Sequence, residues 1–508
     1  MKKVILIFFL WVVIDSTNAQ DAIGIFEKQV DVGNTKAGAA TYSAQNQAYT
    51  IEGSGNNVWF NHDGFHYVYR QMKGDFILRC NASLAGNGGE SHRKLGWMIR
   101  ASLDSTAACV SLAMHGDGLT SLQYRRHNDD SMQEVESSIT KPAVLQLERR
   151  GTTFIMSVAR DGETLTSDSI QLDLGDNVYI GLFVCSHDAN ATETGNFYDV
   201  RIVVPAPATL VPYKEYVGSQ LEILDVETGR SRIIYQSPRS LQAPNWMKDG
   251  KRLLFNSDGL IYTFDLDNSA VAVLNTGSVK RNNNDHVISF DGKMLGLSSG
   301  TASSDASIVY TVPITGGEPK QITPTGPSYL HGWSPDGKYL AFVGQRNDEF
   351  DIYKVASDGS GTEIKLTNTK GLDDGPEYSP DAKYIYFNSV RSGRMQIWRM
   401  RPDGSKPEQL TNDEFNNWFP HISPDGKSIV FVSFGQDVRP SDHPFYKHVY
   451  IRLMPADGGK PKVIATLYGG QGTMNTPSWS PNGKYIAFIS NSNFLSPIYL
   501  TEGEKGKQ

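Results

Sequence analysis

The sequence predicts an all-β protein in which an N-terminal β-sandwich, jelly-roll-like, is followed by a six-bladed β-propeller. Three observations support this prediction. A short phrase recurs along the second half of the chain, the first half contains many short strand-like segments without helical periodicity, and a proline-rich stretch lies between them.

The recurring phrase is clearest at residues 333–337, where tryptophan and serine are followed by proline, aspartate and glycine. Its copies are separated by about 42 to 57 residues, the period typical of propeller blades. Proline presets φ in such a turn and glycine tolerates positive φ, so each copy should end one strand and start the next. The residues at the serine position of the six copies are Met247, Ser289, Ser334, Ser379, Ser423 and Ser480.

Residues 328–367 show what one copy contains. Alternating or apolar runs at 332–334, 338–343, 351–355 and 363–367 are separated by polar turns, which predicts four antiparallel strands, or one blade. The last copy lacks its outer strands, and strand-like runs at 220–225 and 231–235 precede the first copy. We therefore expect the start of the propeller to complete its last blade and remove an open sheet edge.

The phrases at 333–342 and 395–404 resemble the repeats of TolB-type six-bladed β-propellers, and the resemblance extends over roughly residues 213–502. It implies the fold more firmly than a function. Propellers of this type serve as docking proteins, as side domains of peptidases and as polysaccharide-active enzymes.

Residues 1–19 read as a signal peptide, since Lys2 and Lys3 precede an apolar run at 4–14 and Ala19 offers a small residue at the cleavage point. This predicts an exported protein, periplasmic or secreted. No later apolar run reaches the roughly 20 residues of a membrane helix. The net charge of −7 gives no basic face for a nucleic acid.

Residues 20–204 are predicted to form the sandwich, and residues 205–212 a stiff proline-rich linker to the propeller at 213–502. The phrase at 95–104, together with 123–126, resembles concanavalin-like jelly-roll domains appended to secreted carbohydrate-active proteins. Three cysteines cannot pair completely, and we expect buried thiols rather than a bridge.

Ionisable residues recur just before the repeat serine of four consecutive copies. Because the first strand of a blade is innermost, such residues should face the central channel. A single histidine is more often a satisfied structural residue, but recurrence favours a site. The four predicted catalytic residues at these positions are His286, His331, Glu377 and His421.

Two chemistries suit this cluster. The three histidines, His286, His331 and His421, could ligate a divalent metal ion, which would then be a cofactor. Alternatively a histidine could act as general acid or base, oriented by Glu377 or Asp285.

Residues expected around the cluster suit an anionic sugar. The guanidinium groups of Arg346 and Arg391 match a carboxylate or sulfate. An insertion at 436–447 lengthens the fifth blade, and insertions often carry binding residues. The other predicted binding residues are Asp373, Asp374, Trp418 and His443, and Tyr329 is a further candidate acid.

In having histidines at the channel of a TolB-type propeller, this chain resembles the oligogalacturonate lyases. That resemblance implies β-elimination on oligosaccharides or polysaccharides that contain uronic acid, as a lyase or as a dehydratase. The alternative is a non-catalytic, TolB-like periplasmic propeller that binds a protein or a glycan.

Overall fold

The computed structural model describes residues 23–86 and 89–494, so the expected signal peptide at 1–19 and the last part of the predicted propeller lie outside the described residues. Within those residues the chain forms 37 strands and no helix, which confirms the all-β prediction. Accordingly, the described chain contains no helical segment with the length and apolar character needed to span a bilayer.

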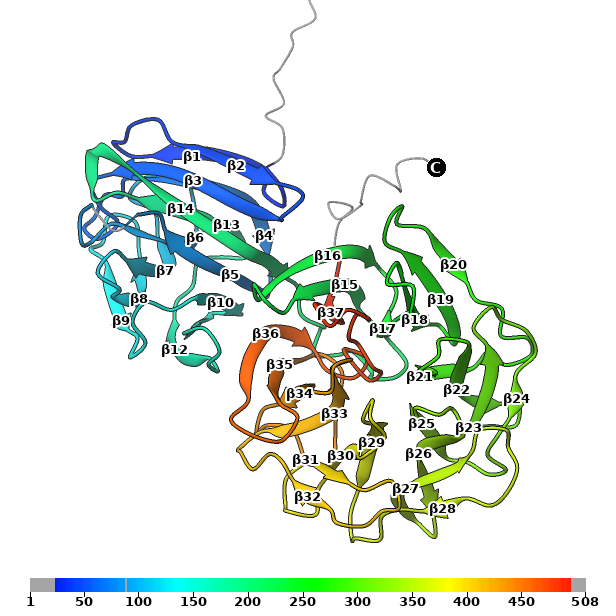
Figure 1. Cartoon of the computed structure of the whole chain (residues 1–508). Coiled ribbons are helices and arrows are strands. Elements are labelled where there is room, and N and C mark those ends of the chain that lie inside the picture. Colours follow the sequence, from blue (N-terminus) through cyan, green and yellow to red (C-terminus); the bar gives the residue numbers. More distant parts are fainter. Residues whose placement is uncertain (1–22, 87–88, 495–508) are drawn as a thin grey trace, which may run out of the picture.

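The N-terminal domain is a sandwich of two seven-stranded antiparallel sheets (Figure 1). Apolar side chains of both sheets, such as Trp97, Leu112, Leu147 and Phe154, meet between them in one core. In spatial order, the first sheet consists of β1 (Lys28–Val32), β4 (Phe65–Lys73), β13 (Asn177–Cys185), β6 (Lys94–Arg100), β7 (Cys109–His115), β8 (Thr120–Arg125) and β9 (Gln133–Glu136). The second consists of β12 (Thr166–Gln171), β11 (Thr153–Ala159), β10 (Val144–Arg150), β5 (Phe76–Leu84), β14 (Asp188–Val203), β3 (Ala48–Gly55) and β2 (Ala39–Ser43).

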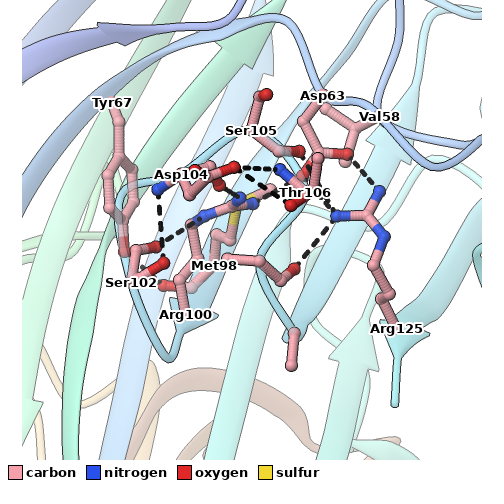
Figure 2. A network of polar contacts seen from close by, with 12 residues as sticks. Val58, Asp63, Tyr67, Met98, Arg100, Ser102, Asp104, Ser105, Thr106 and Arg125 are labelled. Carbon is pink, nitrogen blue, oxygen red and sulfur yellow. Dashed lines mark hydrogen bonds and ion pairs between the residues drawn. The ribbon is translucent and has the colours of Figure 1, made fainter. Parts of the chain in front are cut away.

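A buried ionic network fixes the loops at one end of the sandwich (Figure 2). The Asp63 carboxylate accepts hydrogen bonds from Arg100 of β6 at 2.7 Å and from Arg125 of β8 at 2.7 and 2.9 Å. All three side chains are fully buried. The Arg125 guanidinium also donates to the Asp130 carbonyl at 2.9 Å and the Arg100 guanidinium to the Asp104 carbonyl at 2.5 Å, so the network ties three loops together. As expected, Cys80, Cys109 and Cys185 are buried free thiols.

The second half of the described chain is a six-bladed propeller, as the repeat predicts (Figure 1). Its closing blade joins β37 (Tyr485–Ser492) to β15 (Gly218–Asp225) and β16 (Arg230–Ser237), so the two ends of the propeller are paired as expected. The other five blades are β17 (Gln242–Trp246), β18 (Arg252–Ser257), β19 (Leu260–Asp265) and β20 (Val271–Val273); β21 (Asn282–Ile288), β22 (Met294–Thr301), β23 (Ser304–Pro313) and β24 (Lys320–Gln321); β25 (Ser328–Trp333), β26 (Tyr339–Arg346), β27 (Glu349–Ala356) and β28 (Ile364–Lys365); β29 (Asp373–Tyr378), β30 (Ile385–Ser389), β31 (Gln396–Met400) and β32 (Glu408–Gln409); β33 (Asn416–Ile422), β34 (Ser428–Phe434), β35 (Lys447–Pro455) and β36 (Lys462–Gly469).

The repeated phrase is a hydrogen-bonded turn. In the third copy the Ser334 hydroxyl donates to the Asp336 carboxylate at 2.7 Å and accepts the Tyr339 backbone N–H at 2.9 Å. Gly337 has a φ of 72°, which favours glycine. The serine side chain therefore stabilises the turn between the first two strands of the blade.

The first strand of each four-stranded blade carries a register shift where it faces the channel. In three of these strands the bulge holds a residue with positive φ followed by proline, and the positive-φ residues are Ala243, Gly375 and Phe419. Bulges turn side chains away from the regular alternation of a strand. The side chains on either side of each bulge therefore do not point the same way.

The sandwich docks against the closing blade and the fifth blade. Arg201 of β14 donates to Glu222 of β15 at 2.7 Å, and both side chains are buried. Gln47 exchanges two hydrogen bonds with the backbone of Ile233 in β16. The Ala206 backbone N–H in the proline-rich segment donates to the Tyr468 hydroxyl at 3.0 Å. These contacts hold the segment that follows the sandwich over the propeller.

Candidate functional site

A cavity of about 670 Å³ lies at one mouth of the propeller channel. It is lined from the innermost strands of five successive blades, so its walls come from residues far apart in the sequence. The lining residues on these strands are Gln242 (β17), Asn282 to Asp285 (β21), Tyr329 and His331 (β25), Asp374 (β29) and Phe419 (β33).

Two further segments cover the cavity. The insertion in the fifth blade contributes His443 and Phe445, and the chain after the proline-rich segment contributes Tyr213 and Tyr216. Both tyrosine rings pack edge-on against Phe445, with ring centroids 5.3 and 5.7 Å apart. The sandwich is thus connected to the propeller through residues that shape the cavity.

One histidine and two aspartates form an ionic cluster in the wall of the cavity. His331 Nε2 lies 3.2 Å from Asp374 Oδ1 and 3.9 Å from Asp285 Oδ1. Burial acts to lower the pKa of His331, but these two carboxylates raise it overall, so the ring holds a proton more firmly than usual. Burial raises the pKa of Asp285 to about 6, and Asp374 adds to that shift. Asp374 is the firmer anion, because the hydrogen bond and charge of His331 outweigh its burial and lower its pKa.

Aromatic rings hold the histidines of the cavity in place. The imidazole of His331 stacks on Phe419, with centroids 5.8 Å apart, and His443 meets the same ring edge-on at 5.3 Å. His443 Nδ1 is hydrogen-bonded to the Gln471 side chain. Phe419 has a φ of 54° at the bulge of β33, so backbone strain helps to place its ring.

The cavity is rich in side-chain amides, and two buried amide atoms lack a protein partner. Asn284 Nδ2 and Asn282 Oδ1 make no hydrogen bond to any described residue, although both residues are at most 5% exposed. A donor and an acceptor left unpaired in a cavity wall fit a polar ligand or ordered water. Neither Lys nor Arg is among the described residues that line the cavity.

Two of the four recurring ionisable residues, Glu377 and His421, form a clamp between blades instead of a site. Glu377 Oε2 lies 2.6 Å from His421 Nδ1, and Glu377 Oε1 accepts the Ile422 backbone N–H at 3.1 Å. Asn245, at the same position of its own blade, accepts the Ile288 N–H at 3.3 Å. The recurrence of hydrogen-bonding groups here is explained by these contacts to the next blade.

His286 lies apart from both the cavity and the contact between Glu377 and His421. Its ring is completely buried, and neither nitrogen makes a well-formed hydrogen bond to a described residue, although the backbone of Ala243 favours its protonated form. Burial lowers its pKa to about 4, so the ring is neutral near pH 7. The expectation that the four residues share one ligand is therefore wrong, because bulges aim them into three environments and only His331 lines the cavity.

The three histidines also do not fit the predicted metal ion. Over residues 23–86 and 89–494, no three His, Cys, Asp or Glu side chains converge in a way that could hold one. Both nitrogens of His421 are engaged within the protein, since Nε2 donates to the Met474 carbonyl at 3.0 Å and Nδ1 lies 2.6 Å from Glu377 Oε2.

Of the predicted binding residues, Asp374 and His443 line the cavity, as does Tyr329. Arg346 instead pairs with Glu363 at 2.8 Å, and Arg391 binds both oxygens of Asp373 at 2.9 Å. These contacts satisfy both guanidinium groups within their blades. Trp418 is completely buried and packs on His443, with centroids 4.3 Å apart. Arg346, Arg391, Asp373 and Trp418 are thus supports outside the cavity lining, not the expected sugar contacts.

The sequence did not single out the asparagines at 282–284 or the tyrosines at 213 and 216. The run of three asparagines just before His286 was the available signal, since it begins an innermost strand. The tyrosines gave none, because their position depends on how the sandwich docks.

Replacing Asp285 by asparagine should change how stability depends on pH. A carboxyl group whose folded pKa is raised contributes stability that is complete below its unfolded value of roughly 4 and lost as the pH rises through its folded value. We expect the variant to gain stability over the wild type as the pH rises from about 4 to about 7, on the order of 2 kcal/mol. Thermal unfolding of both proteins across this range measures it, and a difference that is flat or falls with pH would contradict the assignment.

Comparisons with known proteins agree with the propeller. The family model for the TolB beta propeller domain matches residues 326–443. The uncharacterized protein Atu1656 of Agrobacterium fabrum is 46% identical over 272 residues, which are 53% of this chain and 92% of that protein. The solved structure of a putative TolB from Agrobacterium tumefaciens is 45% identical with a TM-score of 0.52, and the match covers 55% of this chain and 99% of that one.

An oligogalacturonate lyase in complex with manganese is a much more distant neighbour. It is 15% identical with a TM-score of 0.39, over 54% of this chain and 82% of that one. Similarity at this level carries no argument about activity.

Proposed function

Because this chain belongs to the TolB-like propeller family that includes the Agrobacterium proteins, we propose that it is an exported, non-catalytic binding protein whose channel mouth holds a neutral glycan. The sandwich, in this proposal a concanavalin-like accessory domain, positions Tyr213 and Tyr216 over the bound ligand. Export rests on the N-terminal sequence and on the family.

The observation that carries the proposal is the composition of the cavity wall. Asn284 Nδ2 can donate to a sugar hydroxyl and Asn282 Oδ1 can accept from one. The Tyr329 and Phe350 rings supply apolar surface against which a sugar ring can lie. Convergent polar groups beside aromatic rings are typical of small-molecule sites.

The charge of the wall selects against an acidic ligand. Asp258, Asp285 and Asp374 contribute carboxyl groups, and His331 supplies the firmest positive charge. That charge is already shared between Asp285 and Asp374, so a uronate carboxylate would meet two acidic groups without a free guanidinium or ammonium partner in the described lining. A neutral oligosaccharide meets no such penalty.

An array of immobilised neutral glycans, acidic glycans and peptides tests the proposal. The wild-type chain should bind neutral glycans, and Asn284→Leu should weaken binding by about 10-fold, since it removes a hydrogen-bond donor and leaves a ligand hydroxyl unpaired. The matched control is Asn412→Leu, an exposed asparagine outside the cavity. Binding only to peptides would favour the protein-docking form of the same family, and equal binding by both variants would refute the site.

β-Elimination is a second candidate, favoured by one observation. Asp285, with a pKa of about 6, could take a proton near neutral pH, and Tyr329 lines the same cavity. Burial raises the pKa of Tyr329, so the hydroxyl stays protonated and able to donate. Incubation with oligouronides, followed by ultraviolet absorbance, tests this candidate. Unsaturated product that disappears in Asp285→Asn would establish the lyase, and no product is expected.

A further inference from the structure

A second, smaller cavity lies on the sandwich, away from the propeller channel. Its volume is about 190 Å³, below the roughly 300–1,000 Å³ of pockets for drug-sized ligands. It therefore suits a compact ligand. The residues that line it are Asn57, Trp59, His92, Lys94, His115, Leu119, Gln123, Glu134 and His187.

Lys94 of β6 is buried in the wall of this cavity without an ion pair. Its ammonium group donates to Asn57 Oδ1 at 3.2 Å and to the Val58 carbonyl at 3.4 Å. No carboxylate oxygen of a described residue lies within 4.0 Å of it, although the residue is only 2% exposed. Burial lowers the pKa of Lys94, as expected for a cation that lacks a close counter-charge. An ammonium group has three donors, so one remains for a ligand.

Two neighbouring side chains also have unused hydrogen-bonding atoms. The Gln123 amide donates to His115 Nε2 at 3.3 Å, so His115 must carry its proton on Nδ1. His115 Nδ1 and Gln123 Oε1 have no partner among the described residues. Burial lowers the pKa of His115 to about 3, so the ring is neutral. The wall thus presents one free donor and one free acceptor beside the Lys94 ammonium.

The acidic groups at the rim have partners of their own. Glu90 lies 3.3 Å from His187 Nδ1, and Glu134 accepts from the Gln123 amide at 3.4 Å. Trp59 is half-buried and offers apolar ring surface at the opening. Glu134 has only the neutral Gln123 amide as its partner, and the ammonium group of Lys94 is the cation in the wall that makes no ion pair with a described residue.

We propose that this cavity binds one acidic sugar ring, with its carboxylate on Lys94, its hydroxyls on His115 Nδ1 and Gln123 Oε1, and its apolar face against Trp59. The two sites then bind sugars of different charge. The sandwich takes an acidic sugar and the propeller channel takes a neutral one.

Titration of the full mature chain with sodium glucuronate tests this assignment, with glucose and sodium acetate as matched probes. Glucuronate should bind at least about 10-fold more tightly than either probe, because only it offers both the carboxylate and the hydroxyls. Lys94→Met should weaken glucuronate binding by about 10- to 100-fold. The control Lys73→Met, at an exposed end of β4, should not change it.

Several outcomes would overturn the proposal. Acetate binding as tightly as glucuronate would show a simple anion site, and glucose binding as tightly would remove the role of Lys94. Lys94→Met should fold, since it removes a buried unpaired charge. If it does not, Trp59→Ala supplies the test, and unchanged glucuronate binding by that variant would refute the site. Asn284→Leu alters the channel cavity and must leave glucuronate binding unchanged. This control distinguishes failure of the sandwich site from failure of the channel site.

Discussion

Replacing Asp63 by alanine is expected to lower the free energy of unfolding of the sandwich by about 3–5 kcal/mol. The carboxylate is the shared partner of Arg100 and Arg125, and all three side chains are fully buried. Alanine would leave two guanidinium groups in the interior without a counter-charge. The loops that carry Asp63 and Asp104 would lose their common attachment through Arg100 (Figure 2).

Urea unfolding of the wild type, Asp63→Ala and Asp168→Ala measures this effect. Asp168 is half-exposed on the edge strand β12, so its replacement should change stability by less than about 0.5 kcal/mol. A comparably small effect of Asp63→Ala would contradict the view that this network holds the sandwich loops.

Replacing Glu377 by alanine should destabilise the propeller by about 2–4 kcal/mol. The change would leave a buried His421 ring and the Ile422 backbone N–H without their acceptor. Glu377→Gln keeps an acceptor for the backbone N–H, but it loses the charge and places an amide nitrogen where an oxygen faces His421. We therefore expect it to cost about half as much.

Thermal unfolding and ligand binding, measured on both variants, separate a structural role of Glu377 from a role in contacting the ligand. If Glu377 is a clamp, Glu377→Gln will fold and bind the channel ligand with unchanged affinity. A variant that keeps wild-type stability but loses binding would mean that Glu377 contacts the ligand.

The fold was predictable because it rests on local chemistry that repeats. The turn at Ser334, Asp336 and Gly337 forms from nearby side chains at short, repeated spacings, and six recognisable copies indicate the blade number. Closure of the ring followed from counting strands, since the outer strands missing after Ser480 were present before Met247.

The site was only partly predictable because it depends on bulges and docking. Spacing from the repeat serine placed His331 and Glu377 in similar positions, but the bulges of β25 and β29 send one side chain into the cavity and the other to the next blade. Arg346 and Arg391 have the right chemistry for an acidic sugar, yet Glu363 and Asp373 neutralise them. Partners on neighbouring strands cannot be read from a single segment.

Calorimetric titration of the wild-type chain with a neutral oligosaccharide and with a uronic oligosaccharide of equal length tests the central claim most directly. Because glucuronate is expected to occupy the sandwich, the titrations are made in Lys94→Met as well, where binding at the sandwich is weakened by about 10- to 100-fold. The account predicts saturable one-to-one binding of the neutral ligand in both proteins, weakened by about 10-fold in Asn284→Leu. Preference of the channel for the uronic ligand in Lys94→Met, or cleavage of it to an unsaturated product, would contradict the account.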